Sequence, residues 1–323
     1  MKDKLNPTIL ITGAGGGSGM YSIKILKESS SAKIIAADSG PLSPGLYIAD
    51  LFYLIPKASQ PEKWKAKIKE IVAEQSVDVI IPNVDEELTL AAKWVDDLDA
   101  RVVISPLETI ETCLDKWNLL ETLKDVIPIP ESSLMSKMDK LTYPCHLKPR
   151  SGRGSRNAYK LESDSELEAI LPKLHNEGLS FDDILIQEFL SGTEFTVDVL
   201  CDENGKTRVI VPRERVRVDR GLSITGKVRK HPEIENQVEN ICSKLKFFGP
   251  VNMQFKLDGN ENPRILEINP RLSGGIPIPY AAGVNTPLLL LKLIAGIEPD
   301  KEEFKFKEGY VLRYLTEVFI GDI

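Results

Sequence analysis

The 323-residue sequence lacks several features that would assign it at once to a class of protein. Its four cysteines, Cys113, Cys145, Cys201 and Cys242, include no Cys-x-x-Cys pair, which argues against a zinc knuckle or a redox dithiol. No apolar run approaches the roughly 18 residues of a membrane-spanning helix. The segment before the first apolar run also has no secretory character. We therefore expect a cytoplasmic protein that is neither secreted nor inserted in a membrane.

Excess positive charge is missing too, because the formal net charge is -7. Proteins that mainly hold nucleic acid or an anionic membrane need a basic surface, so neither partner is expected. Hydrophobic residues make up 42% and charged residues 28%, a mixture typical of soluble globular proteins. Because domains usually run to about 100 to 200 residues, the chain has room for two or three of them.

The first third of the chain alternates short apolar runs with amphipathic stretches, which predicts a parallel sheet with helices between its strands. The strands are expected at 8–12, 34–37, 77–82 and 102–104, and the helices at 20–28, 64–74 and 88–95. The pattern ends near residue 112, where we place a domain boundary. We expect an α+β part with antiparallel strands to follow it.

In that second part, strands are expected at 146–148, 184–189, 194–201, 208–212, 251–257 and 264–268, and helices at 165–176, 233–244 and 286–295. The apolar run from Pro287 to Ala295 would suit either the core or a contact between copies of the chain. A core position is preferred, because helices with such runs are usually buried. No sequence feature determines the oligomer, and a homo-oligomer stays open.

A glycine-rich segment, Gly13 to Gly19, follows the first strand, and Asp38 ends the next one. One interpretation is a dinucleotide-binding turn, and the other is a tight turn in a Rossmann-like domain that has another task. Read from Gly13, the third glycine of the fingerprint is replaced by Ser18. The second interpretation is therefore favoured.

A second glycine-rich segment, 150–156, follows Lys148 at the end of an apolar strand. Glycines allow backbone N–H groups to approach phosphate oxygens, and the lysine and arginines add charge, so the segment is suited to close over a triphosphate. The alternative is a solvated basic turn. It is less favoured, because a lysine within an apolar strand has a desolvation cost that calls for a partner.

Two further segments suggest a nucleotide and a metal ion. The stretch from Ile186 to Asp198 predicts a strand, a hinge that can present backbone groups to an adenine, and a second strand; the alternative is a plain β-connection with exposed acids. Glu267 and Asn269 share one face of a strand at period two, which offers oxygen ligands to magnesium. Arg271 would face the same side if the strand continued through Pro270, a pattern suited to phosphoryl transfer.

Taken together, these motifs resemble the ATP-grasp superfamily, in the branch of the carbamoyl-phosphate synthase large subunit. They are Asp115-Lys116, Pro144 to Lys148 with its glycine loop, Gln187-Glu188 to Glu194, Gln254, and Glu267 to Arg271. The resemblance implies an α/β plus α+β fold. Its three parts are a Rossmann-like pre-ATP-grasp domain (1–112), an ATP-grasp N-terminal subdomain with the phosphate loop (113–190) and a C-terminal subdomain with the metal and substrate site (191–323). It also implies that the first glycine turn does not bind NAD.

The resemblance further implies a role for each matching residue. The phosphates of ATP would be bound by Lys116, Lys148, Gly152, Gly154 and Ser155, the adenine by Gln187, Glu188, Phe189 and Leu190, and the ribose by Glu194. Magnesium, or manganese, would be held by Gln254, Glu267 and Asn269. Lys148, Glu267, Asn269 and Arg271 would be the catalytic residues. Because Gln254 is an amide where many members have a carboxylate, metal is expected mainly through Glu267 and ATP.

The activity that this resemblance implies is an ADP-forming ligase that joins a small-molecule carboxylate to an amine or thiol through an acyl phosphate. One alternative is phosphorylation of bicarbonate or carbamate, as in one half of a synthase, and a more distant one is an NAD-binding or non-catalytic protein. Arg213, Arg215 and Arg217 alternate along a strand that leads to Arg220. These four arginines are candidates for binding an anionic substrate, unless they form a solvated strand paired with nearby acids.

Overall fold

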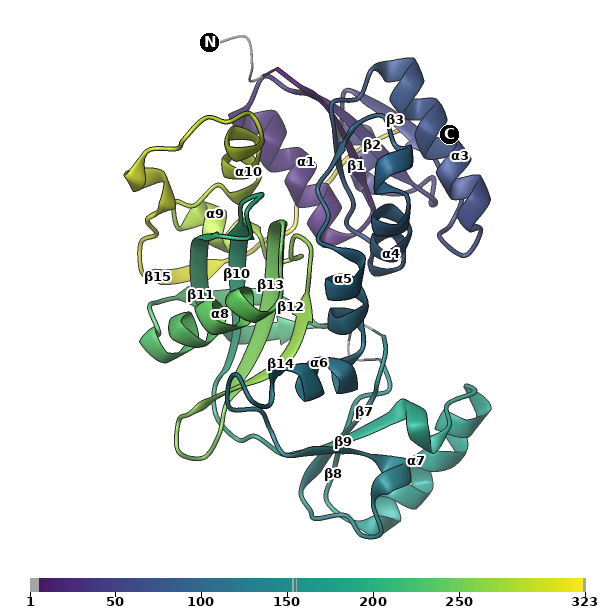
Figure 1. Ribbon diagram of the computed structural model, residues 1–323, viewed down its shortest axis with the longest axis vertical. Coiled ribbons are helices and arrows are strands. Elements are labelled where there is room, and N and C mark those ends of the chain that lie inside the picture. Colours follow the sequence, from purple (N-terminus) through teal and green to yellow (C-terminus); the bar gives the residue numbers. More distant parts are fainter. Residues whose placement is uncertain (1–5, 153, 155, 322–323) are drawn as a thin grey trace.

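The computed structural model describes residues 6–152, 154 and 156–321, and its first element of architecture is a parallel sheet (Figure 1). The strand order is β3-β2-β1-β4-β5, and every pairing is parallel. The strands are β1 (Thr8–Thr12), β2 (Lys33–Asp38), β3 (Leu51–Leu54), β4 (Val79–Ile81) and β5 (Arg101–Val102). The helices are α1 (Gly17–Ser29), α2 (Pro44–Ile48), α3 (Pro61–Gln75) and α4 (Asp85–Lys93). Central strands such as β1 are apolar on both faces because helices cover both sides.

Two helices connect this sheet to a small antiparallel sheet that forms a separate lobe at the bottom of Figure 1. They are α5 (Leu107–Leu114) and α6 (Lys116–Leu123). Asp115 begins α6 by accepting hydrogen bonds from the backbone N–H groups of Trp117 and Asn118. The small sheet has the order β6 (Ser132–Leu134), β9 (Ile184–Glu188), β7 (Cys145–Pro149), β8 (Tyr159–Leu161), and α7 (Asp164–Asn176) lies beside it.

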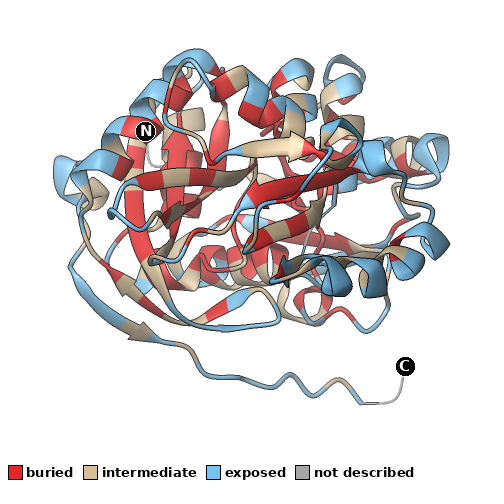
Figure 2. Ribbon diagram, turned by 90° about the horizontal axis from the view of Figure 1, so that it is seen from below, coloured by how far each residue is buried: buried red, intermediate tan, exposed pale blue. Residues whose placement is uncertain are grey.

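The third sheet is antiparallel and has six strands. Its order is β14 (Pro263–Asn269), β13 (Gly249–Leu257), β10 (Glu194–Cys201), β11 (Thr207–Asp219), β12 (Leu222–Val228), β15 (Gly309–Leu312). The helices α8 (Pro232–Lys244), α9 (Pro277–Ala281) and α10 (Thr286–Ile294) pack against it or beside it. Beyond β15 the chain continues as an exposed extended segment, visible in Figure 2.

This architecture confirms the predicted fold class, a parallel α/β sheet followed by two antiparallel sheets. The helix that contains the apolar run of residues 287–295 is part of the core, since Leu289, Leu290 and Leu291 are buried beside α1. The exact boundaries proposed for the three domains stay predictions. No helix in the described part of the chain combines the length and apolar character needed to cross a bilayer.

Two strand predictions need correction. β11 continues to Asp219, well past the expected end at residue 212, because its outer half is a charged hairpin arm without an apolar run. β14 ends at Asn269 and does not continue through Pro270, so the expected alternation cannot place Arg271.

Candidate functional site

A cavity of about 650 Å³ lies between the small lobe and one face of the six-stranded sheet. Most of the predicted site residues line it: Lys116, Lys148, Gly152, Gly154, Gln187, Glu188, Leu190, Glu194, Arg213, Arg215, Arg220, Gln254, Glu267, Asn269 and Arg271. Phe189 and Arg217 do not line it. Ser155 lies outside the described residues.

The floor of the cavity is polar because alternate side chains of three neighbouring strands point into it. β13 contributes Asn252 and Gln254, and β14 contributes Glu267 and Asn269. In the strand register Gln254 pairs with Glu267, and Asn252 pairs with Asn269. The amide nitrogen of Asn269 donates a hydrogen bond to Oε1 of Glu267 at 3.1 Å. Glu267 and Asn269 thus lie on the same face of β14, as their spacing of two residues predicts.

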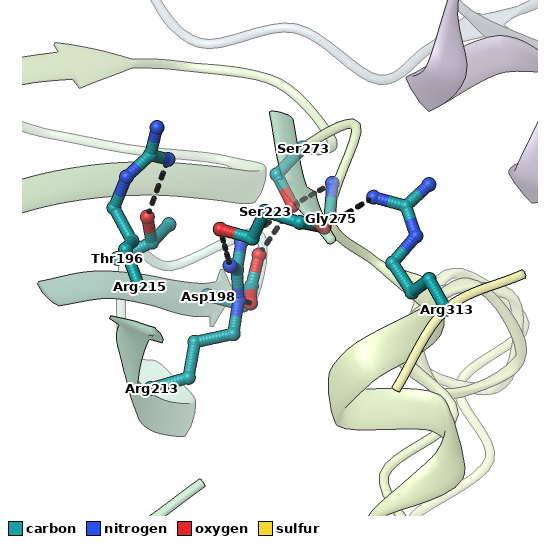
Figure 3. A network of polar contacts seen from close by, with 8 residues as sticks. All are labelled: Thr196, Asp198, Arg213, Arg215, Ser223, Ser273, Gly275 and Arg313. Carbon is teal, nitrogen blue, oxygen red and sulfur yellow. Dashed lines mark hydrogen bonds and ion pairs between the residues drawn. The ribbon is translucent and has the colours of Figure 1, made fainter. Parts of the chain in front are cut away.

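The arginines of the floor are already paired with acids, as Figure 3 shows for the Arg213 group. Arg213, whose exposed fraction is 1%, binds Asp198 through Nε at 2.7 Å and the hydroxyls of Ser223 and Ser273 at 3.3 Å. Arg215 Nε lies 2.8 Å from Glu194 Oε1, an ion pair without the geometry of a hydrogen bond. These contacts support the pairing with nearby acids that the alternative expected, but not its solvated strand, because the Arg213 side chain is buried.

Arg217 departs from the predicted face for a geometric reason. The register of β11 against β12 shifts on both sides of Arg217, which is where a β-bulge changes the direction of side chains. Arg217 is exposed and lies outside the cavity. The expectation that Arg213, Arg215 and Arg217 form one row is therefore wrong beyond Arg215.

Arg271 lines the cavity as predicted, but a continuing β-strand does not place it there. After β14 ends, its Nε donates to Asp85 at the start of α4, and its Nη1 donates to the carbonyl oxygen of Leu272 at 3.1 Å. The sequence offered no indication of Asp85, because the two residues are 186 positions apart. The N-terminal parallel sheet thus contributes a carboxylate to the cavity's edge.

Glu267 is distinct among the acids at the floor and edge of the cavity. Asp85, Asp198 and Glu194 each have an arginine partner, whereas no described lysine or arginine forms an ion pair with Glu267. One free carboxylate beside the amide oxygens of Gln254 and Asn269 fits a magnesium ion that takes its other ligands from phosphates. It does not fit an all-protein cage, since the described residues contain no cluster of three His, Cys, Asp or Glu side chains.

Two lysines line the cavity together with this carboxylate, Lys148 on β7 of the small lobe and Lys116 at the start of α6. Lys148 Nζ donates to Oε1 of Gln187 at 3.0 Å, and Lys116 Nζ donates to the carbonyl oxygen of Gly152 at 2.8 Å. Burial lowers the pKa of Lys148 to about 8, with Glu267 acting in the opposite direction and Lys116 in the same one. Lys148 is therefore mainly protonated at neutral pH and close to its titration range.

The glycine loop above these lysines is open. Gly152 has φ +120° and Gly154 has φ +68°, and no other atom would lie within 4 Å of a Cβ added at Gly152. The loop is anchored where Arg150 Nε binds the carboxylate of Asp115 at 2.7 Å. Its backbone is thus accessible to a ligand in the cavity.

At the other end of the cavity, Phe189 is turned away and His146 takes its place. The two rings are stacked with centroids 5.6 Å apart, and Lys160 Nζ lies 4.2 Å from the Phe189 ring. Burial, assisted by Lys256 and Lys148, lowers the pKa of His146 to about 4, so its imidazole is neutral at pH 7. The expected contact of Phe189 with an adenine is not supported by this arrangement.

The first glycine-rich turn makes contacts within the chain. Asp38 accepts a hydrogen bond from the backbone N–H of Gly15 at 2.7 Å, and a Cβ on Gly17 would lie 3.3 Å from Cα of Gly274. The start of α1 thus packs against the segment that follows Arg271. This supports the interpretation as a tight structural turn.

Comparison with protein families gives two matches that together span most of the chain. Residues 9–104 match "PylC-like, N-terminal domain", and residues 180–318 match "ATP-grasp in the biosynthetic pathway with Ter operon". The chain contains an ATP-grasp domain. This confirms the predicted family, and the matched residues include the predicted hinge, β14 and Arg271.

Curated relatives of this ATP-grasp chain include two carbamoyl-phosphate synthases. The arginine-specific large chain from Bacillus subtilis is 24% identical over 77% of this chain, and the synthase from Methanobrevibacter smithii is 23% identical over 94%. The match covers 25% of the Bacillus protein and 85% of the Methanobrevibacter protein. The chain thus spans about a quarter of the length of the first relative.

Solved structures show the same fold at low identity. An L-amino acid ligase from Bacillus licheniformis has a TM-score of 0.74 and 17% identity over 93% of this chain and 78% of its own. An N5-carboxyaminoimidazole synthetase from Staphylococcus aureus, complexed with ADP, has a TM-score of 0.73 and 18% identity over 92% of this chain and 80% of its own. These likenesses establish the fold of the ATP-grasp chain.

Proposed function

We propose that this ATP-grasp protein is an ADP-forming ligase that uses ATP and magnesium, or manganese, to join a carboxylate to an amine or a thiol through an acyl phosphate. The observation that carries the proposal is Glu267, which forms no ion pair with any described lysine or arginine, on a floor where the neighbouring acids are paired with arginines. Family membership supports ATP and magnesium as well. Two similar structures are described with ADP or with its magnesium salt.

In this proposal Lys116, Lys148 and the backbone of the Gly152–Gly154 segment bind the phosphates, and Glu267, Gln254 and Asn269 hold the metal. When bound, magnesium would neutralise the charge that develops on the transferred phosphoryl group. Lys148 and Arg271 add positive charge on two sides of the transferred group. No side-chain nucleophile is needed, because the substrate supplies the attacking oxygen.

The reaction proceeds in two balanced steps. A carboxylate oxygen bonds to the γ-phosphorus while the bond to the β–γ bridging oxygen breaks, which gives an acyl phosphate and ADP. An amine nitrogen or thiol sulfur then bonds to the acyl carbon, phosphate leaves, and the nucleophile loses a proton to solvent. Positioning and charge neutralisation supply most of the catalysis.

A second candidate is phosphorylation of bicarbonate or carbamate. The names of the curated relatives favour it, since both are carbamoyl-phosphate synthases. In that case bicarbonate alone would support release of ADP without an organic acid.

Hydroxylamine separates the two candidates, because it traps organic acyl phosphates as hydroxamates. The protein is incubated with magnesium, ATP, hydroxylamine and a panel of organic acids, and ADP and hydroxamate are measured together. The ligase proposal predicts equal amounts of both with at least one acid. ADP release with bicarbonate but with no acid would support the second candidate. Failure of the magnesium complex of AMPPNP to raise the melting temperature, with a shift by NAD instead, would contradict both.

A further inference from the structure

The hairpin between β11 and β12 has an unusual residue at its tip. Its two-residue turn consists of Arg220 and Gly221, with φ angles of +46° and +80°. Positive φ at both positions is characteristic of a type I′ turn, where Asn-Gly is strongly preferred. Arginine is disfavoured in this conformation, because its Cβ crowds the backbone. Residues held in such conformations are often found at functional sites, which led us to ask what Arg220 can bind.

The tip of this hairpin lies beside the glycine loop. A Cβ on Gly221 would be 4.0 Å from Cα of Gly154, and a Cβ on Gly274 would be 2.8 Å from Cδ2 of Leu222. The tip therefore spans the distance between the glycine loop and the segment that follows Arg271. Arg220 itself lines the cavity from this position.

Arg220 also differs from the three other arginines on this side of the cavity, because it forms no ion pair with a described acid. Arg213, Arg215 and Arg271 are each paired with a carboxylate, and Arg215 additionally donates to the carbonyl oxygen of Gly221 at 3.0 Å. No described acid lies within ion-pairing distance of Arg220, and its side chain is exposed. Three other cations of the lining, Lys116, Lys148 and Arg156, belong to the side of the cavity assigned to phosphates. A fourth, Lys256, lies 5.3 Å from the Phe189 ring, at the end assigned to the adenine.

We propose that Arg220 determines specificity for an acyl substrate that carries a second carboxylate besides the one that is activated. A guanidinium group binds a carboxylate through two parallel hydrogen bonds, which makes it selective for that geometry. This inference rests on the proposed ligase function and moves substrate recognition from Arg213 and Arg215 to the hairpin tip. The mouth of the cavity, rather than its floor, then selects the substrate.

Arg220→Asn is the decisive variant, because asparagine suits the turn and lacks the charge. Three matched pairs serve as probes: glutamate and glutamine, aspartate and asparagine, succinate and succinamate. Release of ADP is measured with each of them in the presence of magnesium, ATP and hydroxylamine. Wild type is expected to prefer the acid of at least one pair by about tenfold in kcat/KM, the size of a charge-assisted hydrogen bond.

In Arg220→Asn this preference should disappear, while the KM for ATP stays unchanged and the melting temperature is equal to or higher than that of wild type. Arg217→Gln, on the strand that leads into this turn but outside the cavity, is the matched control and should keep the preference. The inference is overturned if wild type does not prefer the acids, if Arg220→Asn keeps the preference, or if the variant raises the KM for ATP instead. The last result would make Arg220 a phosphate ligand. Binding of the magnesium complex of AMPPNP by wild type, measured in parallel, shows separately whether the proposed ligase function holds.

Discussion

Asp85 and Arg271 form an ion pair that joins the first turn of helix α4 to the segment immediately after β14. The side chains are 12% and 15% exposed, so the contact is shielded from solvent on most sides. It fixes the guanidinium group at the edge of the cavity and couples the N-terminal sheet to the proposed site of phosphoryl transfer. The parallel sheet is thus expected to influence the reaction and not only the stability of the chain.

Asp85→Asn tests this coupling. The amide keeps the shape but removes the charge that orients Arg271, so we expect kcat for ADP release to fall about tenfold or more with little change in the KM for ATP. Asp97→Asn, which breaks the exposed pair with Lys65, is the control and should have wild-type kinetics. Wild-type kcat in Asp85→Asn would show that Arg271 does not depend on this contact.

The lowered pKa of Lys148 predicts how nucleotide binding depends on pH. Its pKa of about 8 in the folded protein lies below the ordinary value of 10.5, so the charged form that binds phosphate is lost as pH rises through 8. The dissociation constant for the magnesium complex of AMPPNP should therefore increase from pH 7 to pH 9, by titration calorimetry. In Lys148→Arg it should change much less, because a guanidinium group stays charged throughout. Equal pH profiles in both proteins would refute this role for the lysine.

The same shift has a consequence for stability. Between pH 8 and pH 10.5 the unfolded chain holds more protons at Lys148 than the folded chain, so this group adds to the free energy of unfolding as pH rises. The difference in free energy of unfolding between wild type and Lys148→Met should move in favour of wild type over that window, measured by urea denaturation. A difference that is independent of pH would contradict the lowered pKa.

Arg213 is predicted to be structural. Arg213→Ala would leave Asp198 buried without its charge partner, and breaking such a pair costs about 3–5 kcal/mol. The midpoint of urea denaturation should fall accordingly, whereas Arg217→Ala should change the free energy of unfolding by about 0.5 kcal/mol or less. A stable Arg213→Ala protein with a raised KM for the organic acid would restore Arg213 as a substrate ligand.

Local sequence patterns were sufficient to predict much of the fold and part of the candidate site. The apolar strands β1 and β10 and the polar alternation of Glu267 and Asn269 follow from periodicity, which depends on nearest neighbours along the chain. The lysine at the end of β7 and the open glycine loop also follow from residue types. These features do not depend on contacts between distant segments.

What could not be predicted depends on such contacts. Asp85 approaches Arg271 only after three sheets have assembled, and the bulge at Arg217 arises from the register with β12. His146 replaces Phe189 at the cavity because the two rings stack on one another. β15 was missed for a different reason, because its apolar run of Tyr310, Val311 and Leu312 is too short to identify a strand by periodicity.

Glu267→Gln tests the central claim most directly. The claim is that this carboxylate, which has no ion pair with a described residue, holds the metal for phosphoryl transfer, so ADP release at saturating ATP and magnesium should fall by about a hundredfold or more. The melting temperature without nucleotide should stay within a few degrees of wild type. Glu239→Gln, an exposed acid on α8, is the matched control. Near-wild-type release of ADP by a folded Glu267→Gln protein would contradict the account.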